Sequence, residues 1–146
     1  MQNANKALLY LLRVLESIGK ILLYSKEYKK AEDFFFTNNQ KDYNASLLLM
    51  IQIGEQSNKV SKETRKKSPE IKWQVIKGFR DRVVHEYVNI DSLIVFSIIK
   101  NDLPELILQI SNCIKEQIQD GVFNIKELEI SKGSIFYQHI NFSMLQ

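Results

Sequence analysis

The sequence predicts an all-α fold: an antiparallel helical bundle of four to five helices, followed by an irregular or short-stranded C-terminal tail. Three observations support this. Apolar residues make up 45% of the 146 residues, which is ample for one hydrophobic core. Only two Pro and five Gly occur, which favours long helices over strands and turns. Apolar positions also recur at steps of three and four residues, as amphipathic helices require.

The first helix is expected from about Lys6 to Lys30. Its apolar positions at helical spacing are Leu8, Leu11, Leu12, Leu15, Ile18, Leu22 and Leu23. A short second helix fits the segment Ala31 to Phe36, and Thr37-Asn38-Asn39 then predicts a break. These two helices are therefore expected to be separated from the rest of the bundle by a polar interruption.

A dense apolar block from Leu47 to Val60 predicts a helix at the centre of the bundle. Gly54 lies within it, and a glycine in mid-helix costs about 1 kcal/mol relative to alanine. We therefore expect another helix to cross closely at Gly54. Glu55 stands four residues before Lys59, which is the spacing of an ion pair on a helix surface, and we interpret it in that way.

Two further helices are expected before residue 120. The run Ser68-Pro69-Glu70 is typical of a helix start, with Pro in the first turn. It leads into four residues that we expect in the core: Trp73, Phe79, Val83 and Val84. A second break follows, where Asp91 is the expected cap of the last helix. Pro104 should bend that helix near residues 100–104 before it resumes to about Gln119.

The helical spacing ends after Asp120-Gly121. Two short apolar runs, Val122 to Ile125 and Ile135-Phe136, could pair as strands or pack as an extended tail. His139 lies in this segment, and we interpret it as incidental. Residues 1–119 are therefore expected to form the bundle domain, and residues 120–146 an extension without an assigned role.

Several classes of site and location are not expected. Cys113 is the only cysteine, so neither an intrachain disulfide nor a Cys-rich zinc site can form. The chain has two histidines and no cluster of His, Cys and carboxylates at metal-ligand spacing. No metal, cofactor or membrane partner is therefore predicted. The absence of a signal peptide and of a membrane span fits a cytoplasmic location.

Charge is distributed unevenly along the chain. Between Lys59 and Arg82 there are nine basic and three acidic residues, a net charge of +6, against −3 for the remainder. A local positive field of this kind could attract a phosphate backbone, with Lys77 and Arg82 as candidate RNA contacts. The alternative is a solvated face of Lys and Arg without a ligand.

The segment Gly78 to Tyr87 holds the residues best suited to chemistry. Asp81 and His85 are four residues apart and share a helix face, so Asp81 could accept a hydrogen bond from the imidazole and fix its tautomer. Tyr87 stands seven residues after Arg80 and would nearly superimpose on it along the axis. Arg80 points about 140° away from His85 in a regular helix, so the two could converge only through a local distortion or across two subunits.

Cleavage of RNA through the 2′-hydroxyl needs one group to accept a proton, one to donate a proton and a cation to stabilise the phosphorane. A two-fold dimer that brought both His85 side chains into one cleft would supply the acid and the base, with Arg80 holding the phosphate. Two alternatives stay open: His85 as a structural partner of Tyr87, and Arg80 as part of a salt bridge.

The Arg-x4-His-x-Tyr element from Arg80 to Tyr87 resembles the signature of the HepT toxins, a branch of the HEPN superfamily. Other segments follow the layout of that family in order and spacing, over about residues 6–117: Ile53-Gly54-Glu55, Ser68-Pro69-Glu70-Ile71-Lys72-Trp73, Gly78-Phe79-Arg80, Ile90-Asp91 and Asp102-Leu103-Pro104-Glu105-Leu106. One departure is Asp81, because the family often has Asn at this position.

The resemblance implies a HEPN-like homodimer that cleaves RNA without a metal, with Arg80 and His85 of both subunits as the catalytic residues; the supporting role of Asp81 rests on helix spacing alone. It also implies a toxin whose cognate minimal nucleotidyltransferase antitoxin adenylylates Tyr87; the added phosphate could then pair with Arg80. DNA is not an expected partner. The alternative is a non-catalytic HEPN binding module that docks a nucleotidyltransferase.

Overall fold

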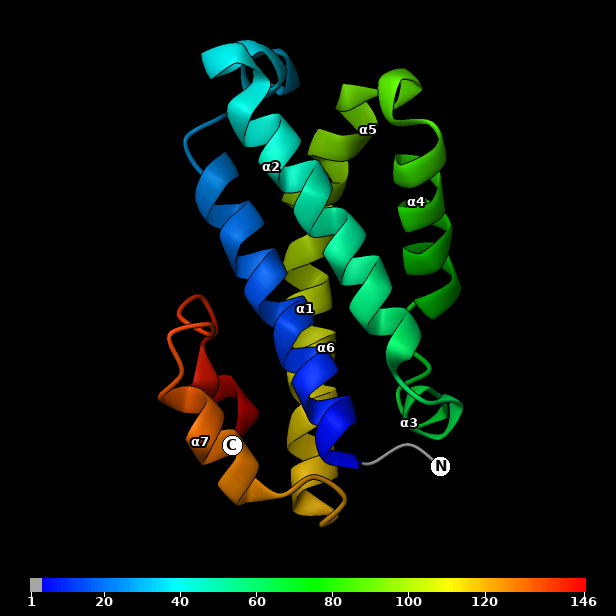
Figure 1. The fold of residues 1–146 in the computed structure, drawn as a ribbon, viewed down its shortest axis with the longest axis vertical. Helices are drawn as coiled ribbons and strands as arrows, with labels where there is room; N and C mark the ends of the chain where they lie inside the picture. Colours follow the sequence, from blue (N-terminus) through cyan, green and yellow to red (C-terminus); the bar gives the residue numbers. More distant parts are fainter. Residues whose placement is uncertain (1–3) are drawn as a thin grey trace.

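A computed structural model describes residues 4–146, which form helices joined by turns and irregular segments and contain no strand in that range. The long helices alternate in direction (Figure 1): α1 (Ala4–Ser25), α2 (Ala31–Lys59), α4 (Trp73–His85), and α5 (Ser92–Ser97) continuing towards α6 (Leu103–Gln119). The expected all-α antiparallel bundle is confirmed.

The core is built around α1, which packs against both α2 and α6. Its inward side chains are fully buried at the spacing that the sequence shows: Leu8, Leu11, Leu12, Ile18 and Ile21. Complete burial of one such side chain contributes about 1.5 to 3 kcal/mol. The helix ends at Ser25, whose hydroxyl donates to the carbonyl oxygen of Ile21 at 2.8 Å. It is therefore shorter than the sequence indicates at its C-terminal end.

The expected interruption of the second helix is confirmed within α2. Thr37 is extended, and Asn38, Asn39 and Gln40 have φ angles of 51°, 57° and 66°. Asn adopts this left-handed region more readily than most residues, because its short polar side chain can bond locally. The segment Ala31 to Phe36 is thus a separate helical stretch before the part of α2 that carries functional residues.

The helix start expected at Ser68-Pro69-Glu70 is wrong, because α4 begins at Trp73. The sequence also gave no indication of the short helix α3 (Lys62–Lys66). Instead of a helix start, this segment forms turns that bury Ile71. The indole Nε1 of Trp73 donates to two backbone carbonyl oxygens, those of Arg65 and Ser68, at 3.2 Å each. These contacts fix the turn from which α4 departs.

The second break and the bend after it lie where the sequence indicates. Asp91 caps α5, because its Oδ1 accepts from the backbone N–H of Leu93 at 2.9 Å. A π-helical turn, η2 (Ile98–Asp102), then joins α5 to α6. Pro104 follows in the first turn of α6 and has no N–H to donate to the preceding turn. The bend therefore takes the form of a π turn ahead of Pro104.

The strands considered for the C-terminal segment are wrong. Asn124 caps a helix instead, α7 (Ile125–Lys132), by accepting from the backbone N–H of Lys126 at 2.8 Å. A 3-10 turn, η3 (Phe142–Leu145), follows and packs against α6. Glu127 stands three residues after Asn124, the spacing of a capping box, and is the sequence signal that could have indicated this helix.

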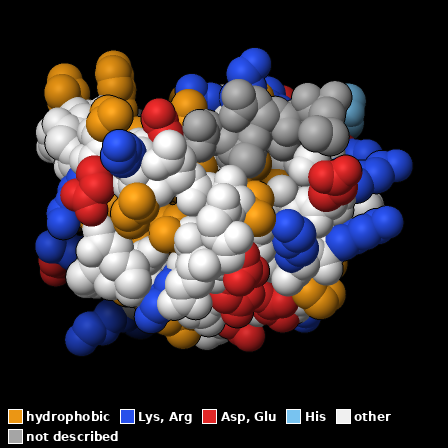
Figure 2. Space-filling model, turned by 90° about the horizontal axis from the view of Figure 1, so that it is seen from below, with side chains coloured by type: hydrophobic (Ala, Val, Ile, Leu, Met, Phe, Trp, Pro, Cys, Tyr) orange, Lys and Arg blue, Asp and Glu red, His pale blue; other side chains and the backbone are white. Residues whose placement is uncertain are grey.

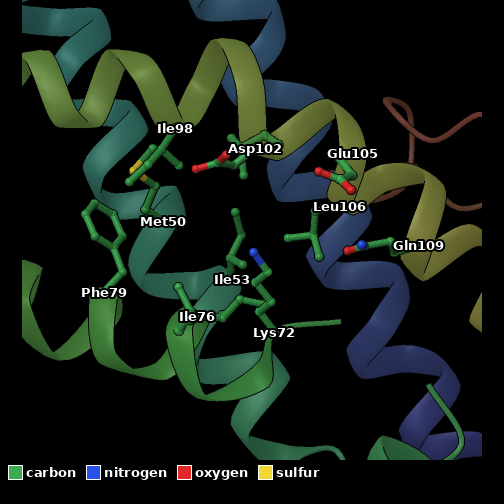
Figure 3. Close-up of a pocket in the computed structure, with 12 residues that line it drawn as sticks. Met50, Ile53, Lys72, Ile76, Phe79, Ile98, Asp102, Glu105, Leu106 and Gln109 are labelled. Carbon is green, nitrogen blue, oxygen red and sulfur yellow. The ribbon is translucent and has the colours of Figure 1, made fainter. Parts of the chain in front are cut away.

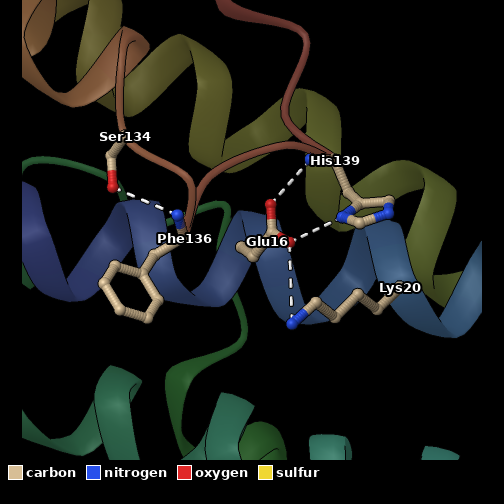
Figure 4. A network of polar contacts seen from close by, with 5 residues as sticks. All are labelled: Glu16, Lys20, Ser134, Phe136 and His139. Atoms are coloured by element: carbon tan, nitrogen blue, oxygen red, sulfur yellow. Dashed lines mark hydrogen bonds and ion pairs between the residues drawn. The ribbon is translucent and has the colours of Figure 1, made fainter.

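His139 anchors the C-terminal segment, so its interpretation as incidental is wrong. Its backbone N–H donates to Glu16 Oε1 at 2.7 Å, and its Nδ1 lies 2.7 Å from Glu16 Oε2 (Figure 4). Lys20 Nζ lies 3.8 Å from the same carboxylate. A Cβ added at Gly19 would stand 2.2 Å from the carbonyl oxygen of His139, so only glycine allows this close approach to α1.

Candidate functional site

Helix α4 directs Arg80 and His85 to different sides. Val83 is fully buried and marks the side of α4 that faces the bundle. His85 follows two residues later, about 200° around the helix axis, and is exposed. Arg80 precedes Val83 by three residues, which places it within about 60° of the buried side. Within one chain the two residues therefore diverge, as their spacing predicts.

Arg80 lies directly against α2 at Gly54. A Cβ added at Gly54 would stand 2.2 Å from the Cβ of Arg80 and 2.5 Å from its Cγ. No such separation between carbon atoms is tolerated, so the two helices can meet here only because residue 54 has no side chain. The close crossing expected at Gly54 is confirmed, and α4 supplies its partner.

The Arg80 guanidinium is held by two carboxylates. Nη2 forms an ion pair with Glu55 of α2, and Nη1 donates to Asp81 Oδ1 at 2.9 Å. The hydrogen bond to Asp81 raises the pKa of Arg80, and Glu55 adds to this rise while desolvation opposes it. The Nε atom is buried without a hydrogen-bond partner. Glu55 thus pairs across the helix crossing, a contact that its interpretation as a surface partner of Lys59 missed.

His85 is the last residue of α4 and is exposed. Among residues 4–146 its side chain takes part in no hydrogen bond or ion pair. The expected hydrogen bond to Asp81 is therefore absent from this structure. Asp81 accepts from the neighbouring Arg80 guanidinium instead. Both imidazole nitrogens of His85 are left available to a ligand.

Tyr87 does not stand above Arg80, as a continuous helix would have placed it. Helix α4 stops at His85, the next residue has φ −128° and ψ 33°, and Tyr87 opens the 3-10 turn η1 (Tyr87–Asn89). Its hydroxyl donates to Oδ1 of Asn44 on α2. Tyr87 thus bonds to a different part of α2 from the part that contacts Arg80.

The separation between these two contacts follows from helix geometry. Asn44 and Gly54 are ten residues apart on α2, which is about 15 Å along the helix axis. The expected pairing of a phosphate on Tyr87 with Arg80 is therefore not supported by this geometry. His85 is much nearer, because two residues of chain span at most about 7 Å.

Comparison with known proteins identifies the family of the chain. Residues 14–113 match the family described as "Ribonuclease HepT-like". The chain belongs to this family. It is 32% identical over 111 residues to "Putative RNase MJ1216" of Methanocaldococcus jannaschii, covering 76% of this chain and 88% of that protein. It is 29% identical over 95 residues to "Probable ribonuclease HepT" of Thermococcus cleftensis, covering 63% and 84%. No solved structure matches it.

The basic segment of this HepT-like chain does not form one patch. Lys77 and Arg82 are both exposed on α4, and Arg82 Nε lies 3.8 Å from a carboxylate oxygen of Glu86. Other members lie on α3, at the opposite end of α4 from His85 (Figure 1). At the end of the bundle seen in Figure 2, Lys and Arg side chains stand beside Asp and Glu. Lys77 and Arg82 are therefore the two candidate cations that share α4 with His85.

Apolar side chains flank His85 on the surface. Val88 is 90% exposed and Val84 is 42% exposed. The expectation that Val84 lies in the core is wrong, because it stands one residue, or about 100°, beyond the buried Val83. Trp73 and Phe79 are half-buried and pack against the core. Two exposed valines therefore stand near His85 in the chain, at the end of α4.

A cavity of about 200 Å³ lies between α2, α4 and α6 (Figure 3). Its walls are apolar, with Phe79 and Ile53 among them, and Lys72, Asp102 and Glu105 extend towards it. Phe79 and Ile53 are the chain neighbours of Arg80 and Gly54, so the cavity lies beside the α2–α4 crossing. Neither Arg80 nor His85 lines it, so the cavity is separate from the site that those two residues form.

Two other kinds of site are missing from residues 4–146. No three His, Cys, Asp or Glu side chains come together there in a way that could hold a metal ion. Nor does any helix in that range have both the length and the apolar character needed to cross a membrane. The polar groups of α4 and its crossing with α2 therefore form the candidate site.

Proposed function

We propose that the protein is a metal-independent endoribonuclease, with Arg80 and His85 as its catalytic residues. The observation that carries this proposal is the exposed His85, without a partner among the described residues, on the same helix as Arg80 in a chain of the HepT-like ribonuclease family. His can accept or donate a proton near neutral pH, and an arginine can hold the phosphate. In this reaction the 2′-hydroxyl attacks the neighbouring phosphorus and the 5′-oxygen leaves.

The site belongs to a homodimer in this proposal. One chain offers a single suitable histidine, whereas the reaction needs both a proton acceptor and a proton donor. A two-fold axis near the exposed end of α4 would place two His85 side chains in one cleft. The exposed Val84 and Val88 support this, because burying them against a second copy removes apolar surface from water.

We further propose that the protein is the toxin of a HEPN/nucleotidyltransferase toxin–antitoxin system, neutralised by adenylylation of Tyr87. The Tyr87 ring is 47% exposed and its hydroxyl is bonded only to Asn44 among the described residues, so an enzyme could reach it. An added nucleotide would be attached two residues from His85 in the chain and would obstruct the cleft. The nucleotide would therefore inhibit proton transfer at His85 rather than phosphate binding by Arg80.

The decisive experiment measures RNA cleavage in the presence of EDTA. We expect the wild-type protein to cleave, and His85→Ala and Arg80→Ala each to reduce the rate by at least a hundredfold. Lys132→Ala, an exposed change on α7, is the matched control and should cleave normally. Wild-type cleavage rates in the His85→Ala variant would show that the catalytic assignment is wrong.

Adenylylation is tested separately by mass spectrometry. After incubation with ATP and a nucleotidyltransferase encoded beside the gene, the wild-type mass should rise by AMP units. Tyr87→Phe should remain unmodified, whereas Tyr43→Phe, which alters a buried tyrosine of α2, should still be modified. Modification that persists in Tyr87→Phe would place the acceptor elsewhere.

The second candidate function is a non-catalytic HEPN module that binds a nucleotidyltransferase. It is favoured by one observation: Arg80 already faces two carboxylates, so its positive charge is compensated within the chain. This candidate predicts a stable complex with the nucleotidyltransferase and no cleavage by the free wild-type protein in the assay above.

A further inference from the structure

We propose that Glu55 competes with RNA for Arg80: its carboxylate occupies the guanidinium in the free protein and is displaced by an RNA phosphate. This inference rests on the proposed ribonuclease function. It concerns a residue of α2 that lies outside the Arg-x4-His-x-Tyr element. It assigns to Glu55 a role in affinity for RNA, distinct from the proton transfers at His85.

Packing, rather than ion pairing, fixes the position of Arg80. Its Cβ and Cγ lie against the backbone of α2 at Gly54, and its Nε is buried. The stem therefore cannot swing away from α2 when an ion pair is broken. It follows that Glu55 is not needed to hold Arg80 in place, and that a phosphate must come to the guanidinium where it stands.

The two carboxylates occupy the positions that a phosphate would need. A phosphate binds arginine best through two parallel N–H groups of the guanidinium fork. With Nε buried, the accessible donors are Nη1 and Nη2, which pair with Asp81 and Glu55 respectively. A phosphodiester can therefore form a bidentate contact with Arg80 only after at least one carboxylate has left the guanidinium.

Glu55 is the carboxylate better placed to leave. The side chains of Arg80 and Glu55 are 30% and 37% exposed, so water can replace the contact, and ion pairs at such exposure are weak. Asp81 is the chain neighbour of Arg80 and stays near it in any rotamer. Glu55 belongs to another helix, and its flexible side chain can turn into solvent.

The local charge gives the expected direction of effect. One guanidinium faces two carboxylates, a net charge of −1, which repels a polyanion. Glu55→Gln keeps the size of the side chain and its capacity to accept a hydrogen bond, and removes one negative charge. We expect a two- to fivefold lower KM for RNA, equivalent to about 0.4 to 1 kcal/mol, with kcat unchanged within twofold.

Glu63→Gln is the matched control. Glu63 lies on α3 in the same basic segment, is exposed, and has no ion pair to Arg80. Its substitution changes the net charge by the same amount, so a general electrostatic effect on RNA would lower KM equally in both variants. An equal effect would overturn the proposal. A tenfold fall in kcat of Glu55→Gln with unchanged KM would overturn it as well, because that result indicates a positioning role.

Binding measured without catalysis separates this inference from the proposed function. A fluorescent 2′-O-methyl oligoribonucleotide, which cannot be cleaved, is titrated with the full-length wild-type, Glu55→Gln and Glu63→Gln proteins. We expect tighter binding for Glu55→Gln alone, even if wild-type cleavage is absent and the catalytic proposal fails. Equal affinities of the wild-type and Glu55→Gln proteins, or no binding by either, would overturn the inference. Thermal melting confirms that each variant is folded.

Discussion

The imidazole and backbone N–H of His139 both contact the carboxylate of Glu16, a residue 123 positions earlier in the chain. Glu16 is almost fully buried on α1. A buried carboxylate requires partners, because an uncompensated charge in the protein interior is costly. The contact therefore stabilises α1 and fixes the course of the segment after α7 together.

Replacing Glu16 with Ala should loosen the C-terminal segment. The substitution removes two hydrogen bonds to a charged acceptor and leaves the His139 N–H without its partner, and we expect a loss of about 2 to 3 kcal/mol in the free energy of unfolding. Urea denaturation measures this loss, and hydrogen exchange of residues 133–145 should accelerate. Glu27→Ala, an exposed change after α1, should have little effect. Unchanged exchange in Glu16→Ala would contradict this account.

Two glycines should respond in opposite ways to substitution by alanine. Gly54→Ala places a methyl group 2.2 Å from the Arg80 Cβ, so we expect a loss of more than about 2 kcal/mol in stability and a loss of RNA cleavage. A Cβ added at Gly78 on α4 would meet no atom within 4 Å, so Gly78→Ala should gain about 0.5 to 1 kcal/mol. Equal effects in thermal melting would refute the close crossing at Gly54.

A charge beside His85 should disrupt the proposed dimer. Val88→Asp places a carboxylate where we expect apolar contact with a second copy, so the protein should become monomeric and lose RNA cleavage. Ile130→Asp is the control, because Ile130 is also an exposed apolar residue but lies on α7. Light scattering coupled to gel filtration gives the oligomeric state. A Val88→Asp protein that is monomeric and fully active would exclude a shared site.

Cys113 should remain unreactive in the folded protein. Burial raises the pKa of its thiol, so the folded state disfavours the reactive thiolate. Above about pH 8.5 the thiol ionises in the unfolded chain but not in the folded one. The stability associated with the neutral thiol is therefore fully present below this pH and is lost as the pH rises. Stability of the wild type should fall relative to Cys113→Ala between pH 7 and pH 10, and a thiol reagent should react only after unfolding.

Much of the fold could be predicted because it depends on local spacing. Three features show this dependence: the apolar positions of α1, the left-handed asparagines in α2 and the Asp91 cap. Each is determined by residues only a few positions apart in the chain. The start of α4 could not be predicted, because Trp73 is positioned by hydrogen bonds to an earlier turn. For the same reason the sequence does not reveal the role of His139, since its partner is far away in the chain.

The candidate site likewise has a part that the sequence predicts and a part that it does not. The directions of Arg80 and His85 follow from their positions on one regular helix, and their spacing alone predicts the divergence. The partners of Arg80 and Tyr87 depend on how α4 crosses α2 and on where α4 ends. Neither feature can be predicted from the spacing of residues that are close together in the chain. For this reason the sequence does not indicate Glu55 as the partner of Arg80 or Asn44 as the partner of Tyr87. The Ile53-Gly54-Glu55 segment is recognisable in the sequence, but its contact with Arg80 is evident only from the crossing.

The atom nearest to a Cβ at Gly54 is the Cβ of Arg80, which every residue except glycine possesses. A HepT-like chain that replaced this arginine with almost any other residue would still need glycine at the crossing. We therefore expect different evolutionary constraints on Gly54 and Glu55, although they are adjacent in the chain. The glycine would persist in a degenerate member that had lost its chemistry, whereas the glutamate would be free to drift.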